Sequence, residues 1–126
     1  MKPALTTRAQ GDLGEDAVVR YLRRRGWQIL ERNFTVKGGE IDIIARRLSY
    51  IVFVEVKTRR ITTNTDKYGH AQDAVDKDKR AHLRYAASRY LATHPTKCKP
   101  RFDIAEVYYH PEKAHSYRVI YRKEAF

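Results

Sequence analysis

This sequence has little cysteine, no zinc-type histidine spacing and no long apolar run. Its single cysteine, Cys98, cannot form an internal disulfide and is typical of a protein from a reducing compartment. The five histidines show no zinc-ligand spacing, and one cysteine cannot complete such a site. No apolar stretch approaches membrane-spanning length, and the first residues contain no apolar core of a secretion signal. We therefore expect a cytoplasmic protein without a membrane partner.

Negative charge is also scarce. The 26 Lys and Arg residues outnumber the 15 Asp and Glu residues and give a net charge of +11. Such an excess favours a polyanionic partner, of which nucleic acid is the usual one. A protein that is merely soluble and basic, or that docks on ribosomes or on a protein partner, has the same charge. The 126 residues have the size of a single domain, with no internal repeat.

The most informative stretch is residues 38–57, which read GGEIDIIARRLSYIVFVEVK. Alternation of apolar and polar residues and many β-branched side chains predict two strands joined by a short turn. Successive side chains of a strand point to opposite faces, so Glu40 shares a face with Asp42, and Glu55 shares one with Lys57.

Asp42 and Glu55 need an explanation, because strands this apolar are expected to be buried on at least one face. If the hairpin places the two acids side by side, their repulsion at ~4 Å is about 4 kcal/mol at an effective dielectric of ~20. A divalent cation would turn this repulsion into attraction, and carboxylates with water are the ligands that Mg²⁺ or Mn²⁺ prefers. Lys57 could then stabilise developing charge or orient a water. The ordinary alternative is a solvated polar stripe on an edge strand, and we rank Glu40 below Asp42 as an outer group or surface charge.

A helix is predicted over residues 12–25, where apolar side chains recur at helical spacing. Glu15 lies at the edge of the apolar stripe and could face the hairpin acids, although the helix dipole favours a first-turn glutamate equally well. Residues 1–9 are expected to be disordered, and residues 27–34 to form the first strand.

The second half begins with a polar segment of little periodicity, residues 58–73, which we expect to be a mobile loop placed as a flap over a substrate. A helix over residues 76–92 and paired strands over 101–109 and 116–122 follow. The order of elements fits an α/β domain with a central mixed sheet flanked by helices. The candidates for phosphate contacts, with a solvated surface as the alternative, are Arg59, Arg60, Lys77, Lys79, Arg80 and Arg84.

Asp42, followed about a dozen residues later by Glu55-Val56-Lys57, resembles the PD-(D/E)XK signature of restriction-endonuclease-like nucleases. The wider sequence resembles the YraN-type family of small bacterial proteins, relatives of the archaeal Holliday-junction resolvases. Matching segments span nearly the whole chain and include GDLGED, GGEIDIIAR, FVEVKTR, RFDI and the final AF. Two departures are Ile41 where the broad signature has proline, as is usual in this subgroup, and a hairpin turn without the Asp-Gly pair often seen there.

The resemblance implies a restriction-endonuclease-like fold with the order α-β-β-β-α-β-β. It also implies a metal-dependent endonuclease that acts on DNA, branched or structured forms included. Mg²⁺ or Mn²⁺ would be held by Asp42, Glu55, the Val56 carbonyl and Glu15, while Lys57 would position or activate the attacking water. Lys79 matches a lysine that recurs in the family at a helix start. Resolvases also suggest a homodimer, because a symmetric cut in two strands needs two sites.

A hypothesis of another class keeps the fold and removes the chemistry: a nucleic-acid-binding module with little or no catalysis. All the expected catalytic side chains are present, which favours the enzyme.

Overall fold

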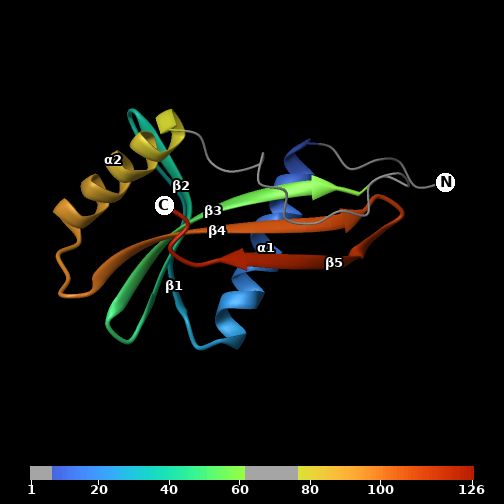
Figure 1. Cartoon of the computed structure of the whole chain (residues 1–126), viewed down its shortest axis with the longest axis horizontal. Coiled ribbons are helices and arrows are strands. Elements are labelled where there is room, and N and C mark those ends of the chain that lie inside the picture. Colours follow the sequence, from blue (N-terminus) through green and yellow to red (C-terminus); the bar gives the residue numbers. More distant parts are fainter. Residues whose placement is uncertain (1–6, 62–76) are drawn as a thin grey trace.

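Five strands form one mixed sheet with two flanking helices (Figure 1). The computed structural model describes residues 7–61 and 77–126. The elements in chain order are α1 (Thr7–Arg24), β1 (Gln28–Val36), β2 (Gly39–Arg47), β3 (Tyr50–Arg60), α2 (Lys77–Thr93), β4 (Lys99–His110) and β5 (Lys113–Arg122). The strands lie in sequence order, and every neighbouring pair is antiparallel except β3 and β4. The parallel pair requires a crossover connection, which contains α2. The predicted α/β architecture and element order are confirmed.

Alternation along β2 and β3 divides the apolar core between the two faces of the sheet. On one face, Ile43 and Val54 pack with α1, and on the other, Ile44 and Phe53 pack with α2. Burial of both faces explains why β3 is a nearly continuous apolar run and not a simple alternating strand. None of the helices within the described ranges is both long and apolar enough to cross a bilayer.

Two element boundaries differ from the prediction. Helix α1 begins at Thr7, so residues 7–9 are helical and not disordered. The Gln10 side chain tethers this first part of α1, since it donates to the Thr58 carbonyl and accepts from the Tyr109 hydroxyl. Strand β3 continues to Arg60 because it pairs with β4 as far as Tyr109, so residues 58–60 are strand and not loop. The rest of the predicted loop lies outside the described residues, apart from Ile61.

The β1–β2 turn brings α2 close to the start of β2. Gly38 has φ of 97°, a left-handed value that favours glycine. A Cβ on Gly39 would lie 2.5 Å from the His82 carbonyl oxygen, so α2 can approach the hairpin only because Gly39 has no side chain. Gly38 and Gly39, which the sequence predicts to form a turn, therefore also allow α2 to pack beside the start of β2.

Candidate active site

Asp42 and Glu55 lie side by side at one end of the β2–β3 hairpin. The antiparallel ladder runs up to Ile43 and Val54, and the next positions along the two strands are those of the two acids. The backbone N–H of Val56 donates to Asp42 Oδ2 at 2.8 Å, and the two carboxyl groups are close enough for each to shift the pKa of the other. The hairpin therefore joins the two residues that the sequence singles out.

The surroundings of Asp42 and Glu55 raise the pKa of both carboxyl groups. Burial and the neighbouring Asp42 raise the pKa of Glu55 to about 7. Burial also raises the pKa of Asp42, although the hydrogen bond from the Val56 N–H opposes this shift. Both shifts disfavour the state in which Asp42 and Glu55 are ionised together, so an added cation would be attracted to the pair.

Lys79 on α2 contributes a positive charge beside the pair. Its Nζ lies 3.3 Å from Glu55 Oε1, and this lysine favours the ionised form of Glu55. The sequence makes Lys79 a candidate for phosphate contacts. In the structure Lys79 forms an ion pair with Glu55. The close packing of α2 against Gly39 brings this lysine near the two acids.

Glu15 approaches the pair from α1. Its side chain is 13% exposed and lies 3.5 Å from an Arg32 nitrogen. Burial raises the pKa of Glu15, and the charge of Asp42 raises it further. In the described part of the chain, no three Asp, Glu, His or Cys side chains have a geometry that could hold one metal ion. The structure thus unites Asp42 and Glu55 and leaves Glu15 at their margin, within electrostatic reach.

Arg32 and Asn33 on β1 are neighbours of Glu15 that sequence reasoning missed. Arg32 pairs with both Glu15 and Asp16, and the Asn33 side chain opposes the rise in the pKa of Glu15. A signal existed in the sequence, because asparagine is unusual inside a strand. Asn33 has φ of 54°, which shows that β1 departs locally from regular strand geometry.

Lys57 lies two residues beyond Glu55 on the same side of β3 and is half-buried. Its partner position on β4 is Glu106, a buried acid that sequence reasoning did not consider. Although burial favours the neutral acid, hydrogen bonds from Tyr108 and Arg122 outweigh it and lower the pKa of Glu106. Lys57 therefore has Glu55 on its own strand face and Glu106 at the paired position of β4.

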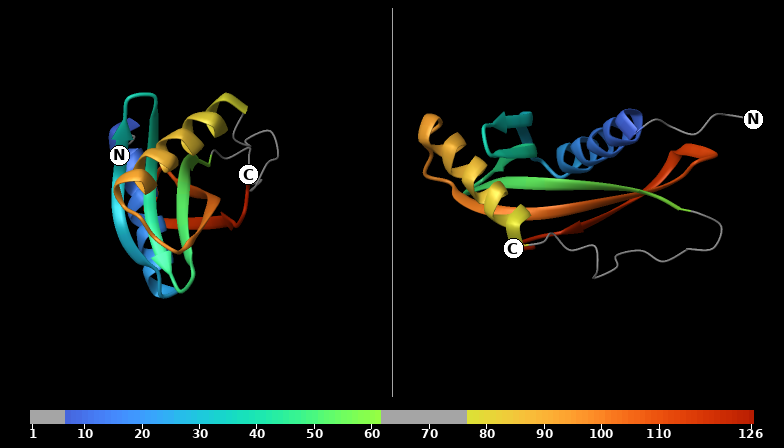
Figure 2. Two further views of the ribbon diagram at one scale, coloured as in Figure 1. Left: turned by 90° about the vertical axis from the view of Figure 1, so that its left-hand side faces the viewer. Right: turned by 90° about the horizontal axis from the view of Figure 1, so that it is seen from above.

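The remaining basic candidates lie on α2 and at the end of β3. Arg80 and Arg84 on α2 lie over the ring of Phe126, at 5.9 and 5.8 Å from its centroid. The C-terminus indeed runs beside α2 (Figure 2). Lys77 is exposed at the start of α2. Arg59 and Arg60 end β3, the first half-buried and the second exposed.

A cavity of about 390 Å³ opens beside the acids, between the β1–β2 turn and α2. Glu40, Lys79 and His82 are among the residues that line it. Solvent and a small ligand can therefore approach Lys79, the residue that pairs with Glu55.

The mixed sheet in this order, with an acid pair at the ends of two neighbouring strands, defines the class: a restriction-endonuclease-like domain. A family model described as "Uncharacterised protein family UPF0102" matches residues 14–107. The chain belongs to this family, which is the YraN family that its sequence resembles.

Curated relatives share this membership. A UPF0102 protein of Caldicellulosiruptor saccharolyticus is 42% identical, over 82% of this chain and 86% of its own. Another from Caldanaerobacter subterraneus is 45% identical, over 82% of each chain. A third, from a Parafrankia species, is 44% identical, over 92% of this chain and 94% of its own. The family match thus covers the segments that carry Glu15, Asp42, Glu55 and Lys57.

Proposed function

We propose that the protein is a metal-dependent nuclease that hydrolyses phosphodiester bonds in DNA, branched or structured DNA included. The observation that carries the proposal is the half-buried Asp42–Glu55 pair, side by side at the end of the hairpin, with the pKa of Glu55 raised to about 7. A site that holds two acids together at this cost is typical of a functional site and not of a packing core. The net charge of +11 supports a polyanionic substrate.

The donor set fits Mg²⁺ or Mn²⁺. Carboxylate oxygens from Asp42 and Glu55, with the Val56 carbonyl, are hard ligands of the kind these ions bind. Glu15 would act from the margin of the site. When bound, the ion would supply positive charge for the scissile phosphate and make a nearby water more acidic.

The side chains of the chain have separate roles. The Val56 N–H fixes Asp42 through Oδ2, so this carboxylate is held in one orientation. Lys79 favours the ionised form of Glu55, and a bound divalent cation would replace the lysine in this role. Lys57, on the same face as Glu55, would hold the attacking water or stabilise charge that develops on the phosphate.

One observation favours the non-catalytic binding module instead. Lys79 already supplies a positive charge 3.3 Å from Glu55, so the acid pair is partly compensated without any metal. A protein that uses this ion pair only to fasten α2 to the sheet would bind nucleic acid and cut nothing.

A cleavage assay tests the proposal. Linear, nicked, flapped and four-way-junction DNA are incubated with Mg²⁺, Mn²⁺ or EDTA. We expect cleavage that needs the metal and that Asp42→Asn or Glu55→Gln abolishes. The matched control is Glu112→Gln, which removes one negative charge at the exposed β4–β5 turn. DNA binding without metal-dependent cleavage would support the binding module.

Metal binding is measured separately by calorimetry, because activity can be lost for other reasons. We expect binding of Mn²⁺ at millimolar to micromolar strength that disappears in Asp42→Asn. Unchanged affinity in both acid variants would show that Asp42 and Glu55 are not ligands. Light scattering tests the homodimer that a symmetric double cut would need.

A further inference from the structure

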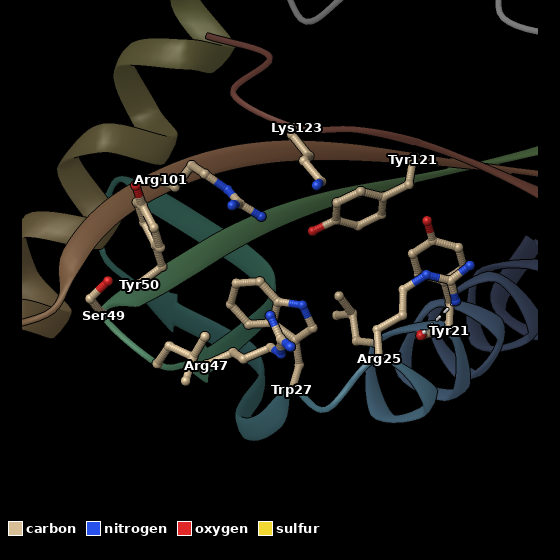
Figure 3. A pocket seen from close by; sticks show the side chains of 11 residues that line it. Tyr21, Arg25, Trp27, Arg47, Ser49, Tyr50, Arg101, Tyr121 and Lys123 are labelled. Carbon is tan, nitrogen blue, oxygen red and sulfur yellow. Dashed lines mark hydrogen bonds between the residues drawn. The ribbon is translucent and has the colours of Figure 1, made fainter.

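A second cavity, of about 540 Å³, is drawn in Figure 3. Its lining includes the β2–β3 turn, so it lies at the opposite end of the hairpin from Asp42 and Glu55. The last part of α1, the β2–β3 turn, the start of β4 and the end of β5 contribute its lining. Arg47 lies five residues past Asp42 on β2, and a strand rises ~3.3 Å per residue, so the two sites are roughly 17 Å apart. A ligand of nucleotide size in this cavity would not reach Asp42 or Glu55.

Positive charge is concentrated in this cavity. Its lining includes four cationic side chains and no carboxylate: Arg25, Arg47, Arg101 and Lys123. Arg101 is already neutralised, since it makes two hydrogen bonds to the buried Asp103. Within residues 7–61 and 77–126, no carboxylate lies at ion-pair distance from the other three. The cavity therefore keeps an excess of positive charge that an anion would compensate.

Aromatic rings form much of the remaining lining. The guanidinium carbon of Arg101 lies 5.2 Å from the ring centre of Trp27 and 5.4 Å from that of Tyr50. Tyr21 and Tyr121 stack on each other with ring centres 5.1 Å apart. Tyr50 is 37% exposed, so one of these rings is open to a ligand. In Figure 3 the ends of Arg101, Lys123 and Tyr121 converge on the space beside Trp27.

We propose that this cavity binds a nucleotide, with the base against Trp27 and Tyr50 and the phosphate held by Arg47 and Lys123. Aromatic faces beside cationic side chains are the combination that binds unpaired nucleotides, because the ring stacks on a base while the cations neutralise the phosphate. The volume lies in the range of pockets for small ligands. Arg25 would support the phosphate from α1, where its guanidinium lies 3.4 Å from the Tyr21 ring centre.

The nucleotide has two possible sources: a free nucleotide, or an unpaired nucleotide within a strand. A neighbouring cavity of about 300 Å³ shares Tyr21 and Arg25 and adds Arg20, Arg24 and Arg118 to the basic surface. This extension is the reason to test a strand beside the free molecule. The proposal stands without cleavage at the acids, since binding here requires neither Asp42 nor Glu55.

Trp27 is the only tryptophan in the chain, so its fluorescence reports on this cavity alone. The intact protein is titrated with adenosine monophosphate, adenosine, inorganic phosphate, a short single-stranded oligonucleotide and a blunt duplex of equal length. We expect saturable quenching by the monophosphate or the single strand at concentrations at which adenosine, phosphate and duplex act weakly. Binding by the free monophosphate assigns the site to free nucleotides as well as strands. Binding by the single strand alone assigns it to strands.

Neighbouring arginines provide the matched variants. Arg47→Gln should weaken binding about tenfold, as expected for the loss of a charged hydrogen bond, and Tyr50→Ala should weaken it about fivefold or more. Arg46→Gln removes the same charge from the adjacent residue. Arg46 does not line the cavity, and its charge instead lowers the pKa of Tyr90 on α2, so this variant should leave binding unchanged. Equal losses in Arg46→Gln and Arg47→Gln would overturn the proposal, as would binding of phosphate as tight as that of the nucleotide, or no quenching by any of the five. Asp42→Asn should keep the quenching, so failure of the proposed nuclease function would be seen separately.

Discussion

Two sets of acids lie on neighbouring strands of one sheet, and their surroundings differ: Asp42 and Glu55 side by side on β2 and β3, and Asp103 and Glu106 on opposite faces of β4. Asp103 and Glu106 on β4 are 0% and 2% exposed, more deeply buried than Asp42 and Glu55. Yet Asp103 accepts hydrogen bonds from Arg101, from the Tyr121 hydroxyl and from the Glu124 N–H. The β4 acids are thus well supplied with donors.

The acid pair on β2 and β3 has fewer donors. Asp42 receives the Val56 N–H, and Glu55 has Lys79, whose own side chain is 49% exposed. The pKa of Glu106 is lowered, whereas the pKa values of Asp42 and Glu55 are raised. Burial alone therefore does not mark a functional acid. The difference is whether the fold supplies enough donors to satisfy the charge.

The largest expected effect is on the well-satisfied acids. Asp103→Ala should lower the free energy of unfolding by about 3–5 kcal/mol, because Arg101 and Tyr121 would lose their buried acceptor. Urea denaturation measures the loss. Asp103→Asn keeps an acceptor oxygen and should lose less, which gives a folded variant for comparison. A loss below about 1 kcal/mol for Asp103→Ala would mean that the hydrogen bonds around this acid contribute little.

The next largest effect concerns Lys57, which lies near both sets of acids. Lys57 shares a strand face with Glu55 and is paired in register with Glu106. We expect Lys57→Ala to slow cleavage at least about a hundredfold while DNA affinity stays nearly unchanged, because the lysine acts in the transition state. Single-turnover rates and binding curves separate the two quantities, with Lys97→Ala, an exposed lysine, as control. If stability falls and the cleavage rate does not, Lys57 belongs to the structural acids of β4.

The hairpin, its faces and the closeness of Asp42 to Glu55 could be predicted because all three follow from local rules. Alternation decides which side chains share a face, and a short turn between the two strands fixes the register. Lys79 could not be placed at Glu55 in this way. Its position depends on how α2 packs against Gly39, an approach of two segments far apart in the chain.

The β4 acids were missed for a similar reason. In the sequence Asp103 and Glu106 look like ordinary polar residues of a half-buried strand. Their partners Tyr121 and Arg122 come from β5, so only the assembled sheet reveals that both acids are satisfied. The aromatic and basic cavity likewise combines residues from α1, the hairpin, β4 and β5.

A pH series sharpens the contrast between the pairs. The folded-state pKa of Glu55 is raised from 4.5 to about 7, so its contribution to stability is present below pH 4.5 and is lost as the pH rises towards 7. Glu55→Gln removes this loss. Relative to wild type, it should gain about 1–3 kcal/mol in unfolding free energy between pH 4.5 and pH 8.

Glu106→Gln should behave in the opposite sense. The lowered pKa of Glu106 means that its contribution is present above pH 4.5 and is lost as the pH falls through its folded-state pKa. The variant should therefore be less stable than wild type at neutral pH, and the gap should close in acid. Urea denaturation across the pH range measures both variants. Parallel pH profiles for the two would contradict the distinction between the acid pairs.

The smallest effect is expected from two basic side chains of α2, Arg80 and Arg84. Arg80 and Arg84 lie over the Phe126 ring on the outer helix, so they can serve DNA only through its phosphates. Arg80→Ala with Arg84→Ala should flatten the plot of log affinity against log salt by up to about two units, at roughly 0.9 for each phosphate that is no longer neutralised. Cleavage at saturating DNA should be largely retained. The control, Arg80→Lys with Arg84→Lys, keeps both charges and should restore the salt slope even if the interactions with the ring weaken. An unchanged slope in the alanine variant would show that α2 is not part of the DNA interface. A much slower cleavage rate would show that Arg80 and Arg84 contribute to the reaction at Asp42 and Glu55.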